Sequence, residues 1–376
     1  MLDATPAADL SARPQLPPVS AAIAAATQPR SGADALLDAA RSLLPVLEAG
    51  RALDAVTLRD AMTRAFGASD ADGAWLWKDA YESAEAAVVL FVQRYGRAMR
   101  RRAGAGSDGP RKMLAMLAAV AALEPSHTKR SEDQVRLQQF STPLPLAYAA
   151  LRAAAVRPGD TVLEPSAGTG MLAVMAECAL GKGATGHLHL NEIAGTRAGL
   201  LAALFPGAAA TRHNAEAIAD YVPHLRPSVV LMNPPFSATP GVERIRHDAD
   251  LRHLRSAFSM LPPGGRLAAI TSAHCVPGDT AWRDAFTFLD GAVRVVFTMA
   301  IDGRAYARRG TGFDTRLTVV ERSAGSGIDI DRDARAPDAG ALLDAVIATM
   351  PPRAAIEPVP GADLFGHRPA PRPAAP

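Results

Sequence analysis

The first third of the chain repeats apolar residues at the spacing of α-helices. Between residues 33 and 47, for example, the leucines fall on one face of a helix. Thr57 is of the residue type that caps a helix at its start, and Gly67 is of the type that ends one. The pattern predicts four helices, over 33–47, 57–66, 75–102 and 111–123. We therefore expect an all-α N-terminal region.

From residue 139 onwards, short apolar runs alternate with helical segments. Strands are predicted over 161–164, 186–191, 208–212, 228–232, 265–271, 292–299 and 315–321. Helices are predicted over 144–155, 168–180, 195–204, 249–261, 278–289 and 338–349. This alternation indicates an α/β fold with a doubly wound, mostly parallel, seven-stranded sheet. The connection 300–314 has no helical pattern, which favours an antiparallel final pair of strands.

Composition along the chain suggests where these regions begin and end. Residues 1–30 are rich in Ala and Pro, and 366–376 in Pro, Ala and Arg, so a disordered arm and a disordered tail are expected. Between them we predict a helical domain, a sheet domain and a C-terminal extension with one helix. Their boundaries are 31–130, 131–325 and 326–365.

Charge and cysteine content exclude few functions. The 376 residues carry a net charge of +2, so a nucleic-acid partner would need locally clustered basic residues. Cys178 and Cys275 lie in apolar surroundings without CxxC spacing, which predicts buried free thiols and no metal site. No signal peptide is evident, and the most apolar stretch, 113–123, is far shorter than the ~20 residues of a membrane span. A cytoplasmic protein without membrane attachment is expected.

Basic residues do cluster near the end of the third predicted helix. The group consists of Arg94, Arg97, Arg100, Arg101, Arg102, Arg111, Lys112, Lys129, Arg130 and Arg136. One interpretation is a solvated helix end, where cations meet the negative end of the helix dipole. The other is a surface that contacts phosphates beside the catalytic site.

The stretch from Thr161 to Met171 has the pattern of a nucleotide-binding unit: a β run, an acidic residue, a glycine-rich turn and a helix. Gly168 and Gly170 allow the backbone to turn sharply and to approach a ligand closely. Glu164 would repel a pyrophosphate at the end of the strand. A cationic group, such as an ammonium, suits it better.

The next two strands also end in polar residues. Glu192 follows the second strand, where a carboxylate can accept hydrogen bonds from both hydroxyls of a ribose. Asn214 follows the third strand, and its amide can both donate to and accept from the edge of an adenine. A surface position is the alternative for both side chains.

The fourth strand ends in Asn233, Pro234, Pro235 and Phe236. Proline has no amide hydrogen, so the backbone carbonyls here can face a ligand without competing donors. With the Asn233 side-chain oxygen they offer acceptors for an NH2 group on a planar ring. Phe236 could stack on that ring, for which base–aromatic contacts contribute ~1–3 kcal/mol.

Together, the EPSAGTG, NPPF and QQFSTP stretches resemble class I methyltransferases that use S-adenosylmethionine, and within them the amino-methylating DNA enzymes. The resemblance implies a catalytic motif at Asn233, Pro234, Pro235 and Phe236, and no metal. It implies that the cofactor is flanked by Phe140, Thr142 and Pro143. Its methionine part would be held by Glu164, Ala167, Gly168 and Gly170. Glu192 would hold its ribose, and Asn214 would meet its adenine. The family usually has Asp at this last position, so Asn214 is a departure.

A narrower resemblance covers roughly residues 130–325. The stretches QQFSTPLPLAYAA, VLEPSAGTGMLAV and NPPFSA followed by LRHLRSAF look like the methylase part of bacterial strawberry-notch-type methylase–helicase proteins of mobile elements. The sequence has no GxxxxGK[ST] phosphate loop. A stand-alone methylase or a detached N-terminal part, with a helicase or other subunit as possible partner, is therefore expected.

These motifs predict transfer of a methyl group to the exocyclic amino nitrogen of an adenine flipped out of DNA. Methylation of an RNA base or of a protein glutamine is the first alternative, because each presents an NH2 on a planar carbon. The second is a non-catalytic DNA-binding module or partner subunit. A dehydrogenase is a poor third, since GxGxxG is missing. The loops 237–250 and 300–314 either face the target or are ordinary solvated loops.

Overall fold

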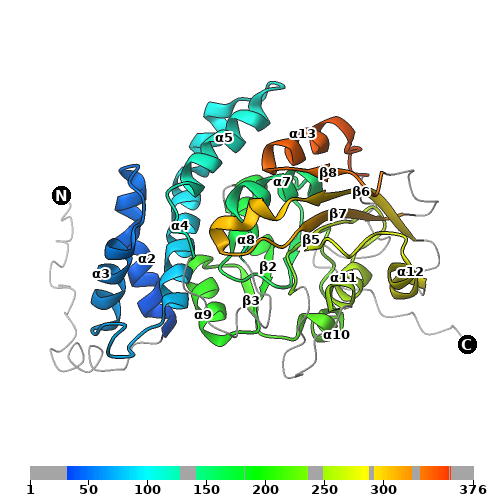
Figure 1. Cartoon of the computed structure of the whole chain (residues 1–376). Coiled ribbons are helices and arrows are strands. Elements are labelled where there is room, and N and C mark those ends of the chain that lie inside the picture. The colour runs from blue at the N-terminus through cyan, green and yellow to red at the C-terminus, as the bar shows by residue number, and fades with distance from the viewer. Residues whose placement is uncertain are drawn as a thin grey trace, which may run out of the picture.

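The computed structural model describes residues 32–127, 141–181, 183–235, 249–287, 292–323, 331–354 and 356 (Figure 1). The predicted arm at 1–30 and the predicted tail at 366–376 lie outside these residues. The expected domain boundary at residue 130 does too, so the division into domains stays a prediction.

Eight strands of the described residues form one sheet in the order β3-β2-β1-β4-β5-β7-β6-β8. Their bounds are β1 Val162–Glu164, β2 Leu188–Asn191, β3 Ala209–Thr211, β4 Val229–Met232, β5 Arg266–Ser272, β6 Val293–Ile301, β7 Thr315–Arg322 and β8 Arg335–Ala336. The first five strands run parallel, and β7 runs antiparallel to both β5 and β6. This strand order, with its inserted antiparallel strand, confirms the predicted class I methyltransferase fold; the two-residue β8 was not predicted.

Helices surround the sheet and precede it in the chain. The described α-helices are α2 Gly32–Glu48, α3 Ala55–Phe66, α4 Trp77–Ala103, α5 Gly109–Ala121, α7 Leu144–Ala154, α8 Met171–Leu180, α9 Gly195–Leu204, α10 Ile218–Tyr221, α11 Ala249–Ser259, α12 Thr280–Phe286 and α13 Ala339–Thr349. Short 3₁₀ turns occupy Thr185–His187, Ala215–Ala217 and Gly303–Arg309. None of the described helices is both long and apolar enough to cross a bilayer.

The two faces of the sheet bury two separate hydrophobic clusters. Because side chains alternate along a strand, Val229 and Leu231 of β4 pack under the helices of one face, while Val230 and Met232 pack under those of the other. The first face is covered by α7, α8 and α13, and the second by α10, α11 and α12. A continuous run of apolar residues in β4 is the sequence signature of such a doubly covered strand.

The N-terminal helices pack on the outside of the first face. Helix α4 lies against α8 and α9, and α2 lies against α9, so their buried residues join the first cluster (Figure 1). Gly96 of α4 makes this contact close, since a Cβ there would lie 2.7 Å from the Cys178 sulfur. Gln93 also donates hydrogen bonds to the backbone oxygen of Leu204 and to Glu177, at 2.9 and 3.1 Å.

Local chemistry explains where the observed elements differ from the predicted ones. Thr57 is not the cap of α3: Asp54 is, and its side chain accepts a hydrogen bond from the Thr57 amide at 2.8 Å. Gly67 ends this helix as predicted, with φ 78°. Helix α8 begins at Met171 rather than 168, because Gly168 and Gly170 hold positive φ angles of 55° and 91°.

The connection between β6 and β7 is also corrected. It was expected to lack helix, but Gly303–Arg309 form a 3₁₀ turn capped by the Asp302 side chain. Both cysteines are buried and free, as predicted, and burial raises the pKa of the Cys178 thiol to about 11.

Candidate active site

A pocket lies at the carboxyl ends of β1, β2 and β4, where open α/β sheets bind ligands. Its walls are Ser141, Thr142, Glu164, Pro165, Ser166, Ala167, Gly168, Thr169, Met171, Leu172, Asn191, Glu192, Ile193, Arg197, His213, Asn214, Ala215, Asn233, Pro234, Pro235 and His253. The pocket thus gathers three predicted strand ends, the glycine turn and the described end of QQFSTP. Phe140 and Phe236 lie outside the described residues, so their predicted places next to the cofactor and the target ring stay predictions.

The glycine turn is held from the neighbouring strand by Asn191. Its side-chain nitrogen donates to the backbone oxygens of Pro165 and His213 at 2.9 and 3.0 Å. Its side-chain oxygen accepts from the His213 amide at 2.8 Å, and its backbone oxygen accepts from the Ala167 amide at 2.9 Å. The sequence analysis treated Asn191 only as the end of a strand, although it joins two walls of the pocket.

Two of the residues predicted to bind the cofactor do not line the pocket. Pro143 begins α7 as the residue before its first turn. Gly170 begins α8, where a Cβ would lie 2.5 Å from the Phe205 ring, so its missing side chain serves packing.

Glu164 is buried at the end of β1, with 2% of its surface exposed. Burial raises the pKa of its carboxyl well above the usual value. A hydrogen bond from the Ala173 amide lowers that pKa in part, and the negative charge of Glu192 raises it further. One carboxyl oxygen, Oε2, has no hydrogen-bond partner among the described residues. A buried acceptor without a partner is costly, so a cationic or donor group of a ligand fits here.

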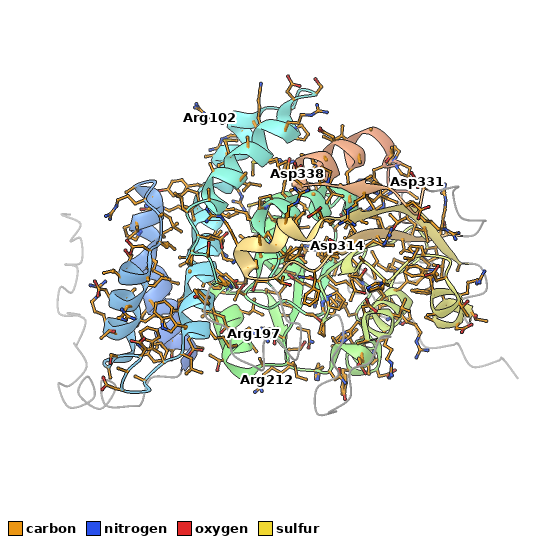
Figure 2. The ribbon with its side chains drawn as sticks, viewed as in Figure 1. Arg102, Arg197, Arg212, Asp314, Asp331 and Asp338 are labelled. Carbon is orange, nitrogen blue, oxygen red and sulfur yellow. The ribbon has the colours of Figure 1, made fainter. Side chains whose placement is uncertain are left out.

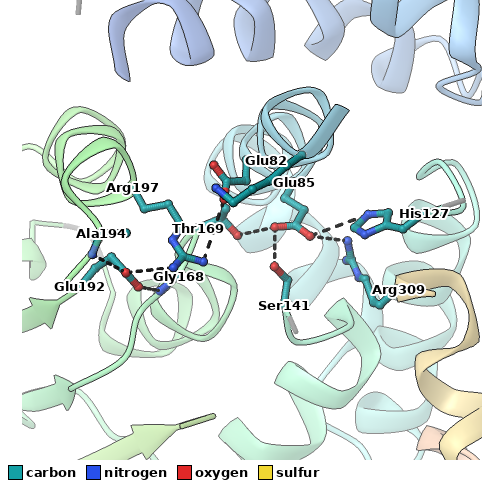
Figure 3. A network of polar contacts seen from close by, with 11 residues as sticks. Glu82, Glu85, His127, Ser141, Gly168, Thr169, Glu192, Ala194, Arg197 and Arg309 are labelled. Carbon is teal, nitrogen blue, oxygen red and sulfur yellow. Dashed lines mark hydrogen bonds and ion pairs between the residues drawn. The ribbon is translucent and has the colours of Figure 1, made fainter. Parts of the chain in front are cut away.

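Glu192 follows β2 and already has protein partners. Its Oε2 accepts from the Gly168 amide at 3.0 Å, and its Oε1 accepts from the Ala194 amide at 2.8 Å (Figure 3). Arg197 of α9 pairs with Oε1 at 3.2 Å. The carboxylate therefore ties the glycine turn to the start of α9, in an orientation fixed by three contacts.

Asn214 lines the pocket beside Ala215 and the half-exposed Ile193. Its side-chain oxygen accepts from the Glu216 amide at 3.1 Å and so caps the following 3₁₀ turn. The side-chain nitrogen is the group of Asn214 that a ligand can meet as a donor. Asp, which the related family usually has here, would offer an acceptor instead.

Asn233 directly follows β4, and Pro234 and Pro235 continue the wall of the pocket. The Asn233 side-chain nitrogen donates to the Thr142 hydroxyl at 2.9 Å. This contact brings the NPP and STP segments together across the pocket. The arrangement places side-chain and backbone oxygens near a buried carboxyl, which is suited to binding an amino group and a cation side by side.

His253 is a pocket residue that the sequence analysis missed. It lies on α11 between Ala249 and Ala257, the residues four positions before and after it, and is 3% exposed. In the part of the chain that the structure describes, neither ring nitrogen has a hydrogen-bond partner. Burial lowers the pKa of the imidazole to about 4, so the ring is neutral near pH 7. A histidine on the apolar face of the predicted helix 249–261 was the available signal.

The described residues of the basic cluster do not line this pocket. Arg97, Arg100 and Arg101 line a different cleft of about 1020 Å³, together with Arg152 and Arg157. Arg100 donates to the Cys178 backbone oxygen in the last turn of α8, and α8 runs away from the pocket towards the opposite edge of the sheet. Figure 2 shows Arg102 far from Arg197, which lines the pocket. The expectation of a phosphate-contacting surface beside the site is therefore wrong for these residues; Lys129, Arg130 and Arg136 are not described.

Two further cations of that cluster have acidic partners. Arg94 pairs with Glu48 at 2.8 Å and Arg111 with Asp344 at 2.6 Å. Lys112 lies on α5, away from the walls of both cavities.

The 300–314 connection is only partly available to a target. Arg309 is buried and pairs with Glu85 and Glu124, so it cannot contact a nucleic acid. Arg304 and Arg308 are exposed. Of the loop 237–250, only the last two residues are described. Among the described residues, no three His, Cys, Asp or Glu side chains are grouped as metal ligands.

No protein-family model matches the chain. Among curated proteins it is similar to a tRNA (guanine(6)-N2)-methyltransferase from Thermus thermophilus, with 36% identity over 146 residues. The match covers 38% of this chain and 42% of the relative, so the chain spans less than half of that relative's length.

Solved structures with similar folds include TrmN from Thermus thermophilus and the M protein of the type I restriction enzyme EcoKI. TrmN is 24% identical, with a TM-score of 0.35 over 47% of this chain and 48% of TrmN. The EcoKI protein is 17% identical, with a TM-score of 0.40 over 74% of this chain and 67% of the other. The fold assignment rests on the strand order itself. The chain has the fold of class I S-adenosylmethionine-dependent methyltransferases, and part of its sequence is similar to an RNA methyltransferase.

Proposed function

We propose that the protein is an S-adenosylmethionine-dependent methyltransferase that methylates the exocyclic amino nitrogen of a flipped adenine in DNA. The observation that carries this proposal is the position of Asn233, Pro234 and Pro235 beside the buried carboxyl of Glu164 in one pocket. One part of the pocket offers acceptors for a target amino group, and the other offers an acidic group to a cationic cofactor.

The residues present fit such a cofactor. The partnerless Glu164 oxygen suits the ammonium of a methionine moiety, and the Glu192 carboxylate can accept from ribose hydroxyls. Ile193 and Asn214 offer an apolar surface and a donor to an adenine. The pocket has a free volume of about 90 Å³, below the ~300–1,000 Å³ of typical small-molecule sites.

When bound, the cofactor supplies an electrophilic methyl group. The protein supplies position and electrostatics. The Asn233 side-chain oxygen and the Pro234 backbone oxygen accept hydrogen bonds from the target NH2, which fixes the nitrogen lone pair towards the methyl group. These residues would hold the amino nitrogen in place for methylation, and the proton that the nitrogen gives up would pass to water. Phe236 stacks on the target ring in this proposal and offsets part of the cost of flipping the base.

A second candidate substrate is a base in RNA. The relative from Thermus thermophilus that shares 36% identity is named for methylation of a guanine amino group in tRNA. Guanine N2, like adenine N6, is an NH2 group on a planar carbon, so the same acceptors serve it. A glutamine amide of a protein presents the same group and is the remaining candidate substrate.

The proposed likeness to methylase–helicase proteins of mobile elements makes a helicase a candidate partner on DNA.

The test is transfer from radiolabelled S-adenosylmethionine to unmethylated DNA, with tRNA and a glutamine-containing protein extract as parallel substrates. Nucleoside analysis identifies the product. We expect N6-methyladenine in DNA, and no transfer by Asn233→Ala although this variant still binds S-adenosylhomocysteine. N2-methylguanine in tRNA would replace the DNA proposal with the RNA one. Absence of both transfer and binding would leave a non-catalytic module.

A further inference from the structure

Glu85 lies in the middle of α4, outside the walls of the pocket, and is 2% exposed. Its carboxylate meets groups from three distant segments. Oε2 accepts from the Ser141 hydroxyl at 2.6 Å and from the Thr169 hydroxyl at 2.8 Å, and Oε1 accepts from Arg309 at 2.8 Å (Figure 3). One side chain of the N-terminal helices thus joins the glycine turn, the segment before α7 and the 3₁₀ turn before β7.

Two of these partners belong to the pocket itself. Thr169 stands in the glycine turn between Gly168 and Gly170, and Ser141 directly precedes Thr142. The Thr142 hydroxyl accepts from the Asn233 side chain at 2.9 Å. A continuous series of contacts therefore runs from Glu85 through Ser141 and Thr142 to Asn233.

The charge at Glu85 is maintained by its neighbours. Burial alone would raise the pKa of its carboxyl, but Arg309, and after it His127 and the two hydroxyls, hold that pKa below the usual value. Arg309 also pairs with Glu124 at 2.6 Å. Burial raises the pKa of Glu124, despite Arg309. Of the two acidic partners of Arg309, Glu85 is thus the one kept ionised most firmly, and it is the one that contacts the pocket segments.

A second connection starts one helical turn earlier on α4. Glu82 pairs with Lys78 at 2.7 Å and lies 4.0 Å from Arg197. Arg197 in turn pairs with Glu192, which accepts from the Gly168 amide (Figure 3). Helix α4 therefore reaches the pocket from both sides of the glycine turn.

We propose that Glu85 is a positioning residue of the active site, and that α4 belongs to the catalytic unit rather than to a separate accessory part. This inference rests on the proposed function. The ionised carboxylate of Glu85 holds the glycine turn and the Ser141–Thr142 segment at a fixed separation. Through Thr142 it also orients the Asn233 amide. Cofactor affinity and turnover both depend on it, although it touches neither cofactor nor target.

Glu85→Gln tests this with Glu124→Gln as its matched control. In Glu85→Gln the amide oxygen can still accept from Arg309, and the NH2 can donate to the two hydroxyls, which then accept. The variant therefore removes the negative charge and reverses the direction of the hydroxyl contacts. Each variant removes one of the two charges that pair with Arg309, so both should lower the melting temperature. Only Glu85→Gln should weaken binding of S-adenosylhomocysteine, by about tenfold, as loss of a charge-assisted hydrogen bond predicts. It should also lower kcat, whereas Glu124→Gln should leave both within about twofold.

The outcomes separate this inference from the proposed function. If the unchanged protein does not bind S-adenosylhomocysteine in calorimetry, the proposed function fails. If it binds, and Glu85→Gln and Glu124→Gln bind equally well with equal kcat, only the role of Glu85 fails. Should Glu85→Gln not fold, Ser141→Ala and Thr169→Val decide, because each removes one contact and leaves the Arg309 pairs intact. Unchanged affinity and kcat in both would overturn the inference.

Discussion

The side-chain nitrogen of Asn233 donates a hydrogen bond to the Thr142 hydroxyl at 2.9 Å, across 91 residues of sequence. The oxygen and nitrogen of a carboxamide point to opposite sides of one carbon, so this bond also sets the direction of the Asn233 oxygen. Thr142 is buried, with 5% exposed, and lies next to the start of α7. The Thr142 hydroxyl therefore holds the Asn233 amide in one orientation for the proposed reaction.

Thr142→Val should lower kcat about tenfold, because it removes one hydrogen bond of about 1–1.5 kcal/mol while keeping the volume of the side chain. Thr142→Ser keeps the hydroxyl and is the matched control, with turnover close to that of the unchanged protein. Steady-state rates at saturating cofactor measure the effect. Equal kcat in the Val and Ser variants would show that the hydroxyl does not orient Asn233 during turnover.

Glu164→Gln should weaken cofactor binding about tenfold to a hundredfold, since a charged hydrogen bond contributes about 1.5–3 kcal/mol. Titration calorimetry with S-adenosylhomocysteine measures this. The same variant should make the ligand-free protein more stable at neutral pH, because the buried carboxyl no longer has to ionise without a partner.

The pH dependence of that stability gain has a definite sign. The pKa of Glu164 is raised in the folded protein above the usual value of 4.5. The folded state then binds the proton more tightly than the unfolded state, so the unchanged protein loses stability as pH rises above that value. Denaturant unfolding should therefore show a gain for Glu164→Gln at pH 7 that shrinks towards pH 4. A gain independent of pH would contradict this account.

His253→Leu should change both stability and ligand binding. The imidazole pKa is about 4 when folded, against about 6.5 in unfolded chains. The unfolded state binds more protons between these values, so His253 costs stability as pH falls from 6.5 to 4, by up to about 3 kcal/mol. The Leu variant should lose less stability over this window in urea unfolding. Asp250, whose raised pKa of about 6 acts in the opposite direction, is common to both proteins and largely cancels.

The two ring nitrogens of His253 also predict a binding effect. They are buried in the pocket wall and have no partners within residues 141–181, 183–235 and 249–287 or the other described ranges, which is the arrangement expected if at least one of them meets the bound cofactor or target. His253→Leu should then raise the dissociation constant or KM for one of the two ligands about fivefold to tenfold. If neither ligand is affected, the histidine has no role in binding.

Arg266 tests what holds the centre of the fold. It is fully buried in β5 and bonds to Glu321 of β7, to the Ala153 backbone oxygen near the end of α7 and to the Pro351 backbone oxygen after α13. Arg266→Leu should lower the free energy of unfolding by about 3–5 kcal/mol, because Glu321 stays behind as a buried charge. The double variant Arg266→Leu with Glu321→Leu should recover part of this loss. A double variant less stable than the single one would contradict the explanation by an unpaired charge.

Local patterns predicted seven of the eight described strands to within a few residues; the two-residue β8 was not predicted. β4 shows why: its four consecutive apolar residues are typical of a strand that is buried on both faces of a parallel sheet. The start of α3 shows the limit of such reasoning. From the sequence alone both Asp54 and Thr57 are plausible helix caps, and the structure shows that Asp54 is the cap and accepts a hydrogen bond from the Thr57 amide.

The candidate site also has residues that the sequence could place and one that it could not. Glu164, Glu192 and Asn233 could be placed near one another from sequence, because the carboxyl ends of parallel strands meet at one edge of the sheet. Their binding roles stay predictions until a ligand is measured. His253 was missed although it falls on the apolar face of the predicted helix 249–261. Periodicity places it on that face, but only the packing of α11 on the second side of the sheet decides that its ring nitrogens line the pocket.

Arg309 shows most clearly what the sequence alone could not determine. In the sequence it is an arginine in a glycine-containing connection, which is typical of a solvated loop. In the structure it is buried between Glu85 and Glu124, and Glu85 lies 224 positions away. Periodicity and turn chemistry act over a few residues and so determine strands, helices and the glycine turn. Which charges share a buried space depends on how helices pack on the sheet, and only the tertiary structure decided that.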